Sequence, residues 1–110
     1  MRLVIEIDTE KNVEGYLALV ALGILDGIKE NQISPMEAMT LLMRPRLFSL
    51  LEDTMPELAD ALHLGSELGN VYRIVPDAYA RSIEQMRQIC LKLIDFSELK
   101  GKCVRYSYEP

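Results

Sequence analysis

The sequence contains few of the residues from which most catalytic and metal sites are built. In 110 residues it has no tryptophan, a single histidine (His63) and two cysteines, Cys90 and Cys103. Structural zinc usually takes four His or Cys ligands, and a nucleophilic triad needs a histidine as its base. We therefore expect a protein that is not an enzyme and has no cofactor and no metal site.

Long hydrophobic runs are also absent. The longest apolar stretch, Tyr16 to Leu25, has ten residues and is followed by Asp26, whereas a membrane-spanning helix needs about 20. The first residues resemble a strand, without the basic and apolar segments of a secretory signal. Because the two cysteines form no spaced framework, their thiols are expected to be free. These features predict a cytoplasmic protein with no membrane association.

Positive charge is scarce. Twelve Lys and Arg residues stand against 17 Asp and Glu, which gives a formal net charge of −5. Nucleic-acid affinity comes largely from cations that displace phosphate counterions, so no nucleic-acid partner is expected. Residues 35–53 can be read as a helix-turn-helix with Arg44 and Arg46 beginning its second helix, but Glu52 and Asp53 follow directly. Two ordinary helices joined by a proline turn are the better interpretation.

The composition, 49% apolar and 26% charged, is that of a globular protein, and 110 residues fit one domain covering 1–110. Residues 2–8 alternate weakly in polarity and predict a short strand. Thr9 can cap a helix from about residue 11 to about residue 30. Gly101 marks a turn, and residues 103–108 predict a second strand. The two strands can form a minor antiparallel sheet.

The helix expected at residues 11–30 is apolar around most of its circumference. One stripe is spaced by four and three residues: Val13, Leu17, Val20, Ile24 and Ile28. Further apolar residues widen it: Tyr16, Leu19, Leu22 and Leu25. Such a helix is typically buried on more than one side, so we expect it to be central and Val20→Asp to prevent folding. Gly23 and Gly27, one turn apart, predict a close helix crossing.

Four more helices are expected, about five in all. Ser34, Pro35 and Glu37 form a capping-box start, and that helix stops before Pro45. Short helices follow near residues 47–54 and from Pro56, with a break at 65–70. Residues 71–75 are either a strand or an extended connection. The last helix, about 77–95, has the clearest apolar seam: Tyr79, Ile83, Met86, Cys90 and Leu93. The fold class is thus α+β and mostly helical.

His63 is the one histidine that could carry chemistry. Asp60 precedes it by three residues and Glu67 follows it by four, so the three can share one helix face. The functional interpretation is a metal site or a carboxylate-oriented general base, and the simpler one is a solvated polar face. A small enzyme or metal-dependent module centred on His63 is therefore the alternative to a binding protein.

A second feature is an acidic segment. Between residues 52 and 67 the chain has no Lys or Arg, and five carboxylates lie there: Glu52, Asp53, Glu57, Asp60 and Glu67. A solvated surface that aids solubility is the simpler interpretation. The functional one is a docking face for a basic protein partner.

Several segments resemble a family of small bacterial proteins known only as a domain of unknown function. They are LALVALGILDGI, ISPMEA, ALHLGSELGNV and CLKLI, together with the opening strand. The resemblance implies a bacterial cytoplasmic protein and adds no substrate, cofactor or site residue.

Together these features favour a non-catalytic protein-binding domain, such as an accessory, regulatory or immunity-type partner. A homodimer is also expected, because the first helix carries more apolar surface than a small domain easily covers. The short helices around Phe48 are the predicted intermolecular face.

Overall fold

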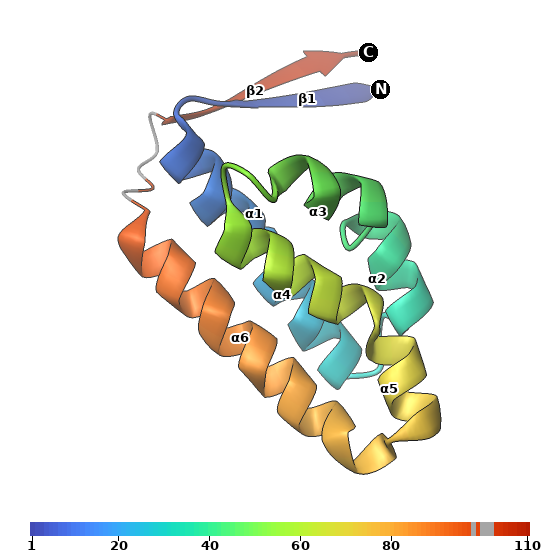
Figure 1. Cartoon of the computed structure of the whole chain (residues 1–110). Helices are drawn as coiled ribbons and strands as arrows, with labels where there is room; N and C mark the ends of the chain where they lie inside the picture. Colours follow the sequence, from blue (N-terminus) through green and yellow to red (C-terminus); the bar gives the residue numbers. More distant parts are fainter. Residues whose placement is uncertain (98, 100–102) are drawn as a thin grey trace.

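The computed structural model describes residues 1–97, 99 and 103–110. Within these residues it contains six α-helices and one two-stranded antiparallel sheet (Figure 1). The elements in chain order are β1 (Arg2–Ile7), α1 (Glu10–Lys29), α2 (Pro35–Leu41), α3 (Pro45–Leu51), α4 (Pro56–Ser66), α5 (Leu68–Ile74), the 3₁₀ turn η1 (Pro76–Ala78), α6 (Tyr79–Phe96) and β2 (Val104–Glu109). The predicted α+β, mostly helical fold is confirmed. The predicted turn at Gly101 lies outside the described residues.

The helix starts follow from local capping chemistry. The Thr9 hydroxyl accepts a hydrogen bond from the Asn12 amide, at 3.4 Å, and caps α1. At α2 the capping box is complete: the Glu37 amide donates to Ser34 Oγ at 3.1 Å, and the Ser34 amide donates to Glu37 Oε1 at 3.0 Å. Proline occupies the first helical position of α2, α3 and α4, where its missing N–H costs nothing.

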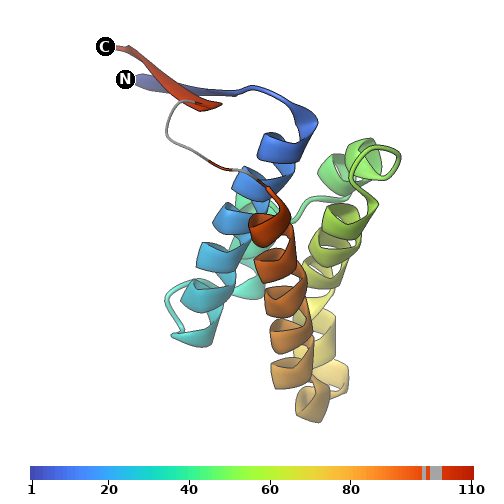
Figure 2. The same ribbon diagram turned by 90° about the vertical axis from the view of Figure 1, so that its left-hand side faces the viewer.

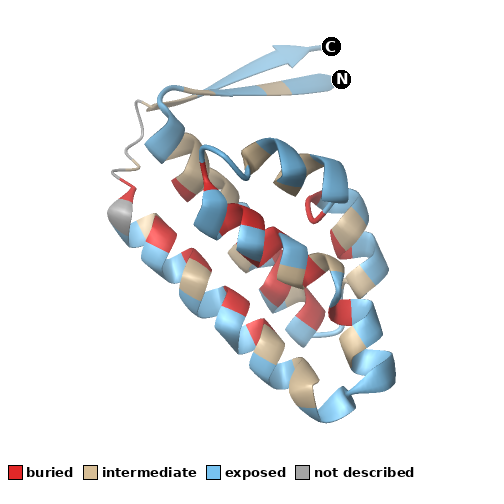
Figure 3. Cartoon of the chain, viewed as in Figure 1, coloured by how far each residue is buried: buried red, intermediate tan, exposed pale blue. Residues whose placement is uncertain are grey.

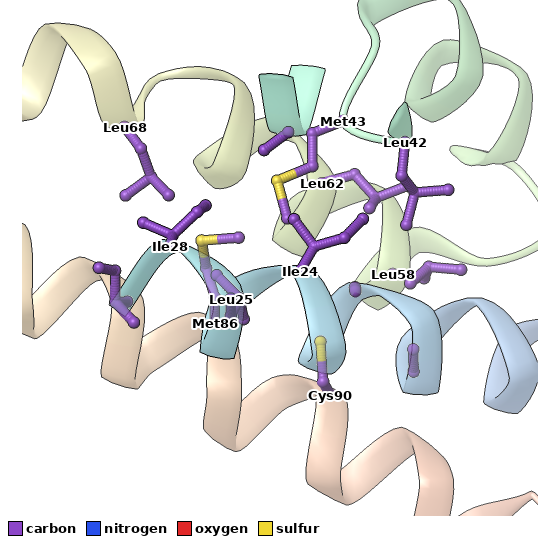
Figure 4. Close-up of a cluster of buried hydrophobic side chains, with 14 of the residues drawn as sticks. Ile24, Leu25, Ile28, Leu42, Met43, Leu58, Leu62, Leu68, Met86 and Cys90 are labelled. Carbon is purple, nitrogen blue, oxygen red and sulfur yellow. The ribbon is translucent and has the colours of Figure 1, made fainter. Parts of the chain in front are cut away.

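The hydrophobic core lies where α1, α4 and α6 meet (Figure 3). Figure 4 shows side chains from all three helices converging there, with Met43 and Leu68 closing the core from the segments beside α4. The seam expected on α6 is confirmed: Met86 and Cys90 are fully buried, and Ile83 and Leu93 nearly so. The α6 seam packs mainly against α1, and α1 also contacts α2 and α4.

α1 is central, with contacts to α2, α4 and α6, but the predicted burial of its whole Tyr16–Leu25 segment is wrong. Leu19 is 48% exposed and Val20 is 37% exposed. The buried positions are Gly15, Ala18, Ala21, Ile24, Leu25 and Ile28. The buried side of the helix thus combines small alanines, which allow the backbones to approach, with larger residues, whereas Leu19 and Val20 lie on the solvent-facing side. Val20→Asp is therefore no longer expected to prevent folding.

The close crossing expected at Gly23 and Gly27 lies elsewhere. A methyl group added at Gly23 would meet no atom within 4 Å, and the nearest atoms to one at Gly27 belong to the Ile33 side chain of the following loop, the first at 2.6 Å. The tight contact is at Gly15, where an added methyl would collide with the Cβ and Oγ of Ser97. The N-terminal half of α1 therefore meets the end of α6 closely.

Residues 71–75 form neither a strand nor an extended connection, because α5 continues through Ile74. Its tyrosine, Tyr72, makes an edge-to-face contact with Tyr79 of α6, with ring centroids 5.1 Å apart. No helix in the described part of the chain is long and apolar enough to cross a membrane.

β1 and β2 form an antiparallel ribbon that extends beyond the helical body (Figures 1 and 2). Leu3 lies opposite Tyr108, and Ile5 lies opposite Tyr106. The ribbon is attached to the body at α1, where the Tyr16 and Tyr106 hydroxyls are 3.4 Å apart. Most of its residues are exposed (Figure 3).

Candidate functional site

The candidate site is a groove between α1 and α6. The two helices are in close contact where Gly15 meets Ser97, and they diverge toward the other end of α1 (Figure 2). Ser97 is buried, and its hydroxyl donates to the Ile94 carbonyl at 2.7 Å, which fixes the side chain against α1. The divergence leaves a groove of about 810 Å³ beside Gly23.

Apolar side chains line most of this groove. Its volume falls within the range of about 300–1,000 Å³ typical of ligand sites. Leu19, Leu22 and Leu25 contribute from α1, and Tyr79 and Ile83 contribute from α6. Because Gly23 has no side chain, the groove stays open where a larger residue would fill it.

Charged residues of both signs lie along the groove. Asp26 and Lys29 come from α1, and Glu84 and Arg87 come from α6. The pKa of Glu84 is lowered chiefly by a hydrogen bond from Gln88, whose Nε2 lies 2.7 Å from Glu84 Oε1, and further by Arg87 and Lys29. Glu84 therefore stays ionised at neutral pH, and the groove is apolar with a charged border of mixed sign.

The titratable groups of the lining are carboxylates, cations and one phenol. Within the described residues it includes no histidine, cysteine or serine. Burial raises the pKa of the Tyr79 hydroxyl, and the nearby Tyr72 raises it further, so this phenol is neutral at physiological pH. The groove thus presents an apolar floor, with charged side chains and one neutral phenol along it.

The structure places Asp60, His63 and Glu67 on α4 or at its end, all exposed. His63 Nε2 lies 2.9 Å from Glu67 Oε1, and the ring stacks on Phe48 with centroids 4.9 Å apart. No group of three or more His, Cys, Asp or Glu side chains in the described part of the chain could hold a metal ion. His63 thus contacts Phe48 and Glu67, and Asp60 is not among its hydrogen-bonding partners.

The five acidic residues are all exposed, at the end of α3, in the turn after it and along α4. Two of them have partners: Glu57 Oε2 lies 3.3 Å from Lys92 Nζ of α6, and Glu67 pairs with His63. The fold therefore brings a cation to a segment that has none in sequence. Glu52, Asp53 and Asp60 remain as the more open part of the predicted docking face.

Neither the cysteines nor Arg44 of the helix-turn-helix segment is among the residues that line the groove. Cys90 is buried, which raises the pKa of its thiol to about 11, and Cys103 is half-buried; both are free. The Arg44 guanidinium donates to the carbonyl of Thr40, through Nε at 2.8 Å and through its second terminal nitrogen, Nη2. Arg44 thereby satisfies a carbonyl at the end of α2.

The dimer face predicted around Phe48 remains a prediction. Phe48 itself is half-buried against His63, and Leu50 is the exposed large apolar residue of α3, at 70%. The groove beside Gly23 was not predicted. Its sequence signal is a glycine next to large apolar residues on the side of the helix away from Ala18 and Ala21.

A sequence profile of the family "Protein of unknown function (DUF3969)" matches residues 8–107. The chain therefore belongs to this family, which confirms the resemblance to a domain of unknown function. The match begins after β1 and covers all six helices. No curated protein and no solved structure matches the chain significantly.

Proposed function

We propose that this protein is a non-catalytic protein-binding domain whose α1–α6 groove receives the apolar face of a partner's amphipathic helix. The observation that carries this proposal is the open apolar groove beside Gly23. Leu19 is 48% exposed there, although it is a large apolar side chain near the middle of the longest helix. A partner would remove this surface from water, which gains about 25 cal/mol per Å² of apolar area.

A helix fits the shape of this surface. Two diverging helices leave a channel between them into which the side-chain ridge of a third helix can pack. Helix-in-groove recognition uses apolar anchors at positions i, i+3 or i+4, and i+7. The border residues Asp26 and Lys29 on one side, and Glu84 and Arg87 on the other, can pair with charges flanking such an apolar stripe.

The proposed role is that of an accessory, regulatory or immunity-type partner in the bacterial cytoplasm. The net charge of −5 supports a protein partner over nucleic acid, and the mostly apolar lining supports binding of an apolar protein surface. The acidic surface is a weaker candidate, because Glu57 already pairs with Lys92 and Glu67 is in contact with His63.

The test is a selection of short helical peptides from a displayed library against the folded protein, with Gly23→Trp used to reject peptides that bind elsewhere. A Cβ at position 23 would meet no atom within 4 Å, and the indole attached to it would occupy space in the groove that Gly23 lines. Val20→Trp is the matched control, because Val20 is also exposed on α1 but does not line the groove. Binding of the selected peptides is then measured by calorimetry.

We expect peptides with an apolar stripe at helical spacing. Each should bind the natural chain and Val20→Trp equally and lose at least tenfold in affinity for Gly23→Trp. Selected peptides that bind Gly23→Trp as well as the natural chain would place recognition on another surface. If no peptide is enriched, the groove does not recognise helices.

A further inference from the structure

The β1–β2 ribbon has one apolar face and two free edges. Leu3 and Ile5 of β1 are 49% and 39% exposed, and Tyr106 and Tyr108 opposite them are 50% and 66% exposed. In the described residues no further strand pairs with either β1 or β2. An isolated two-stranded ribbon is only marginally stable in water, and an uncovered strand edge is a template for pairing.

The direction of the free backbone groups on β1 follows from the ladder. The Asp8 amide donates to the Cys103 carbonyl at 3.3 Å, on the β2 side. Because alternate residues of an antiparallel strand point to opposite edges, the even-numbered residues of β1 bond to β2. The N–H and C=O groups of Leu3, Ile5 and Ile7 therefore point to the free edge.

We propose that β1 pairs with β1 of a second copy of this chain, antiparallel and centred on Val4, to give a four-stranded sheet. In this register Leu3 lies opposite Ile5 of the second copy, and each has its N–H and C=O directed at the other. Val4 lies opposite Val4, on the two-fold axis. Because the pairing is symmetric, the free edge of β1 in each copy is covered by β1 of the other copy.

Charge complementarity supports this register. Arg2 lies opposite Glu6 of the second copy, on the face away from the leucine and tyrosine side chains. Within the ribbon, Arg2 already pairs with Glu109 at 3.4 Å, and Arg105 pairs with Glu6 at 3.3 Å. A line of side chains across the four strands would then alternate in charge: Glu109 and Arg2 of one copy, followed by Glu6 and Arg105 of the second copy. Opposite charges in directly opposed positions stabilise a sheet.

The free edge of β2 is less suited to the same pairing. Tyr106 and Tyr108 direct their backbone groups outward, and by the same alternation Pro110 lies at an outward position. Proline has no N–H to donate, and it is one of the residues that protect strand edges. A sheet centred on Ser107 would also oppose two serines, whereas the β1 pairing opposes two β-branched valines.

The test compares two proline variants at positions that face each other in the ribbon. Leu3→Pro removes an N–H from the free edge of β1, and Tyr108→Pro removes one from the free edge of β2. Neither substitution removes an N–H group that donates a hydrogen bond between β1 and β2. Sedimentation equilibrium of the natural chain and of Tyr108→Pro should give a mass near twice 12.5 kDa, and Leu3→Pro should give the monomer mass.

Disulfide cross-linking provides a measurement that does not depend on the proline variants folding. In a Cys103→Ser background, Val4→Cys should form a covalent dimer on mild oxidation. Opposed residues in a non-hydrogen-bonded pair have Cα atoms about 4.5 Å apart, within disulfide range. Ser107→Cys should remain monomeric. A monomeric natural chain, or cross-linking at Ser107 in place of Val4, would overturn the proposal.

Discussion

Gly15 and Gly23 lie eight residues apart on α1, and alanine should have opposite effects on stability at the two positions. At Gly23 an added methyl group meets nothing within 4 Å. Alanine is favoured over glycine in a helix interior by about 1 kcal/mol. Gly23→Ala should therefore raise the free energy of unfolding by up to about 1 kcal/mol.

At Gly15 the same methyl group would collide with the side chain of Ser97. Ser97 is 2% exposed and is held by its hydrogen bond to Ile94, so it cannot simply rotate into solvent. Overpacking a tight contact costs about 1–3 kcal/mol, against the same gain of about 1 kcal/mol in helix propensity. Gly15→Ala should thus be neutral to about 2 kcal/mol destabilising, and less stable than Gly23→Ala by about 1–3 kcal/mol.

Urea unfolding followed by circular dichroism gives both values. In thermal melts, 1 kcal/mol corresponds to about 4 °C in Tm for a domain of this size. Ser97→Gly should remove the penalty, so Gly15→Ala in that background should be stabilising. Equal stability of the two alanine variants would refute the inferred close contact between α1 and the end of α6.

Four further predictions concern burial, helix capping, thiol reactivity and the pH dependence of stability. Val20→Asp should change the free energy of unfolding by about 1 kcal/mol or less, because Val20 is partly exposed. Ala18→Asp should prevent folding, so that no cooperative unfolding transition is seen, because Ala18 is fully buried. Ser34→Ala should lower the free energy of unfolding by about 1 kcal/mol in urea titrations, through loss of the cap on α2. In thiol-labelling kinetics Cys103 should react in the native protein and Cys90 only after unfolding. Burial raises the pKa of the Cys90 thiol from 9.0 to about 11, so the thiol of the unfolded chain ionises at lower pH than that of the folded protein. The stability that the neutral Cys90 thiol contributes should therefore be lost as pH rises from about 9 to 11. Cys90→Ala should lack this loss of stability.

The helix boundaries were largely predictable because caps depend on residues a few positions apart. Ser34, Pro35 and Glu37 determine the start of α2 through their own side chains and backbone. The end of α2 was less accurate: the helix stops at Leu41, ahead of the boundary expected before Pro45. Residues 71–75 were misread because Val71, Ile74 and Val75 are β-branched, and in the protein the tyrosine of α5 packs edge-to-face against Tyr79 of α6 instead of joining a sheet.

The buried face of α1 could not be chosen from hydrophobicity alone. Leu19 and Val20 are more hydrophobic than Ala18 and Ala21, yet the alanines are buried. The deciding factor is how closely two backbones approach, which depends on a helix more than 50 residues further along the chain. The groove has the same origin, because it exists only where α1 and α6 diverge. For the acidic segment, the cation beside Glu57 is Lys92 of α6, which the local sequence does not contain.

The ribbon and the groove lie at different ends of α1, so the two proposals make one joint prediction. Residue 23 is 13 positions beyond the start of α1, about 20 Å at 1.5 Å per residue. Pairing through β1 should therefore leave the groove open and give a dimer with two grooves. A selected peptide free in solution should bind the natural chain and Leu3→Pro with the same affinity per chain. On a surface densely coated with that peptide, the dimer should dissociate at least tenfold more slowly than the Leu3→Pro monomer, because its second contact is intramolecular. Surface plasmon resonance at high and low peptide density separates the two cases, since the advantage should disappear when peptides are too sparse to be bridged. A slower dissociation that persists at low density would mean that dimer formation changes the groove itself, and the two surfaces would then be coupled through α1.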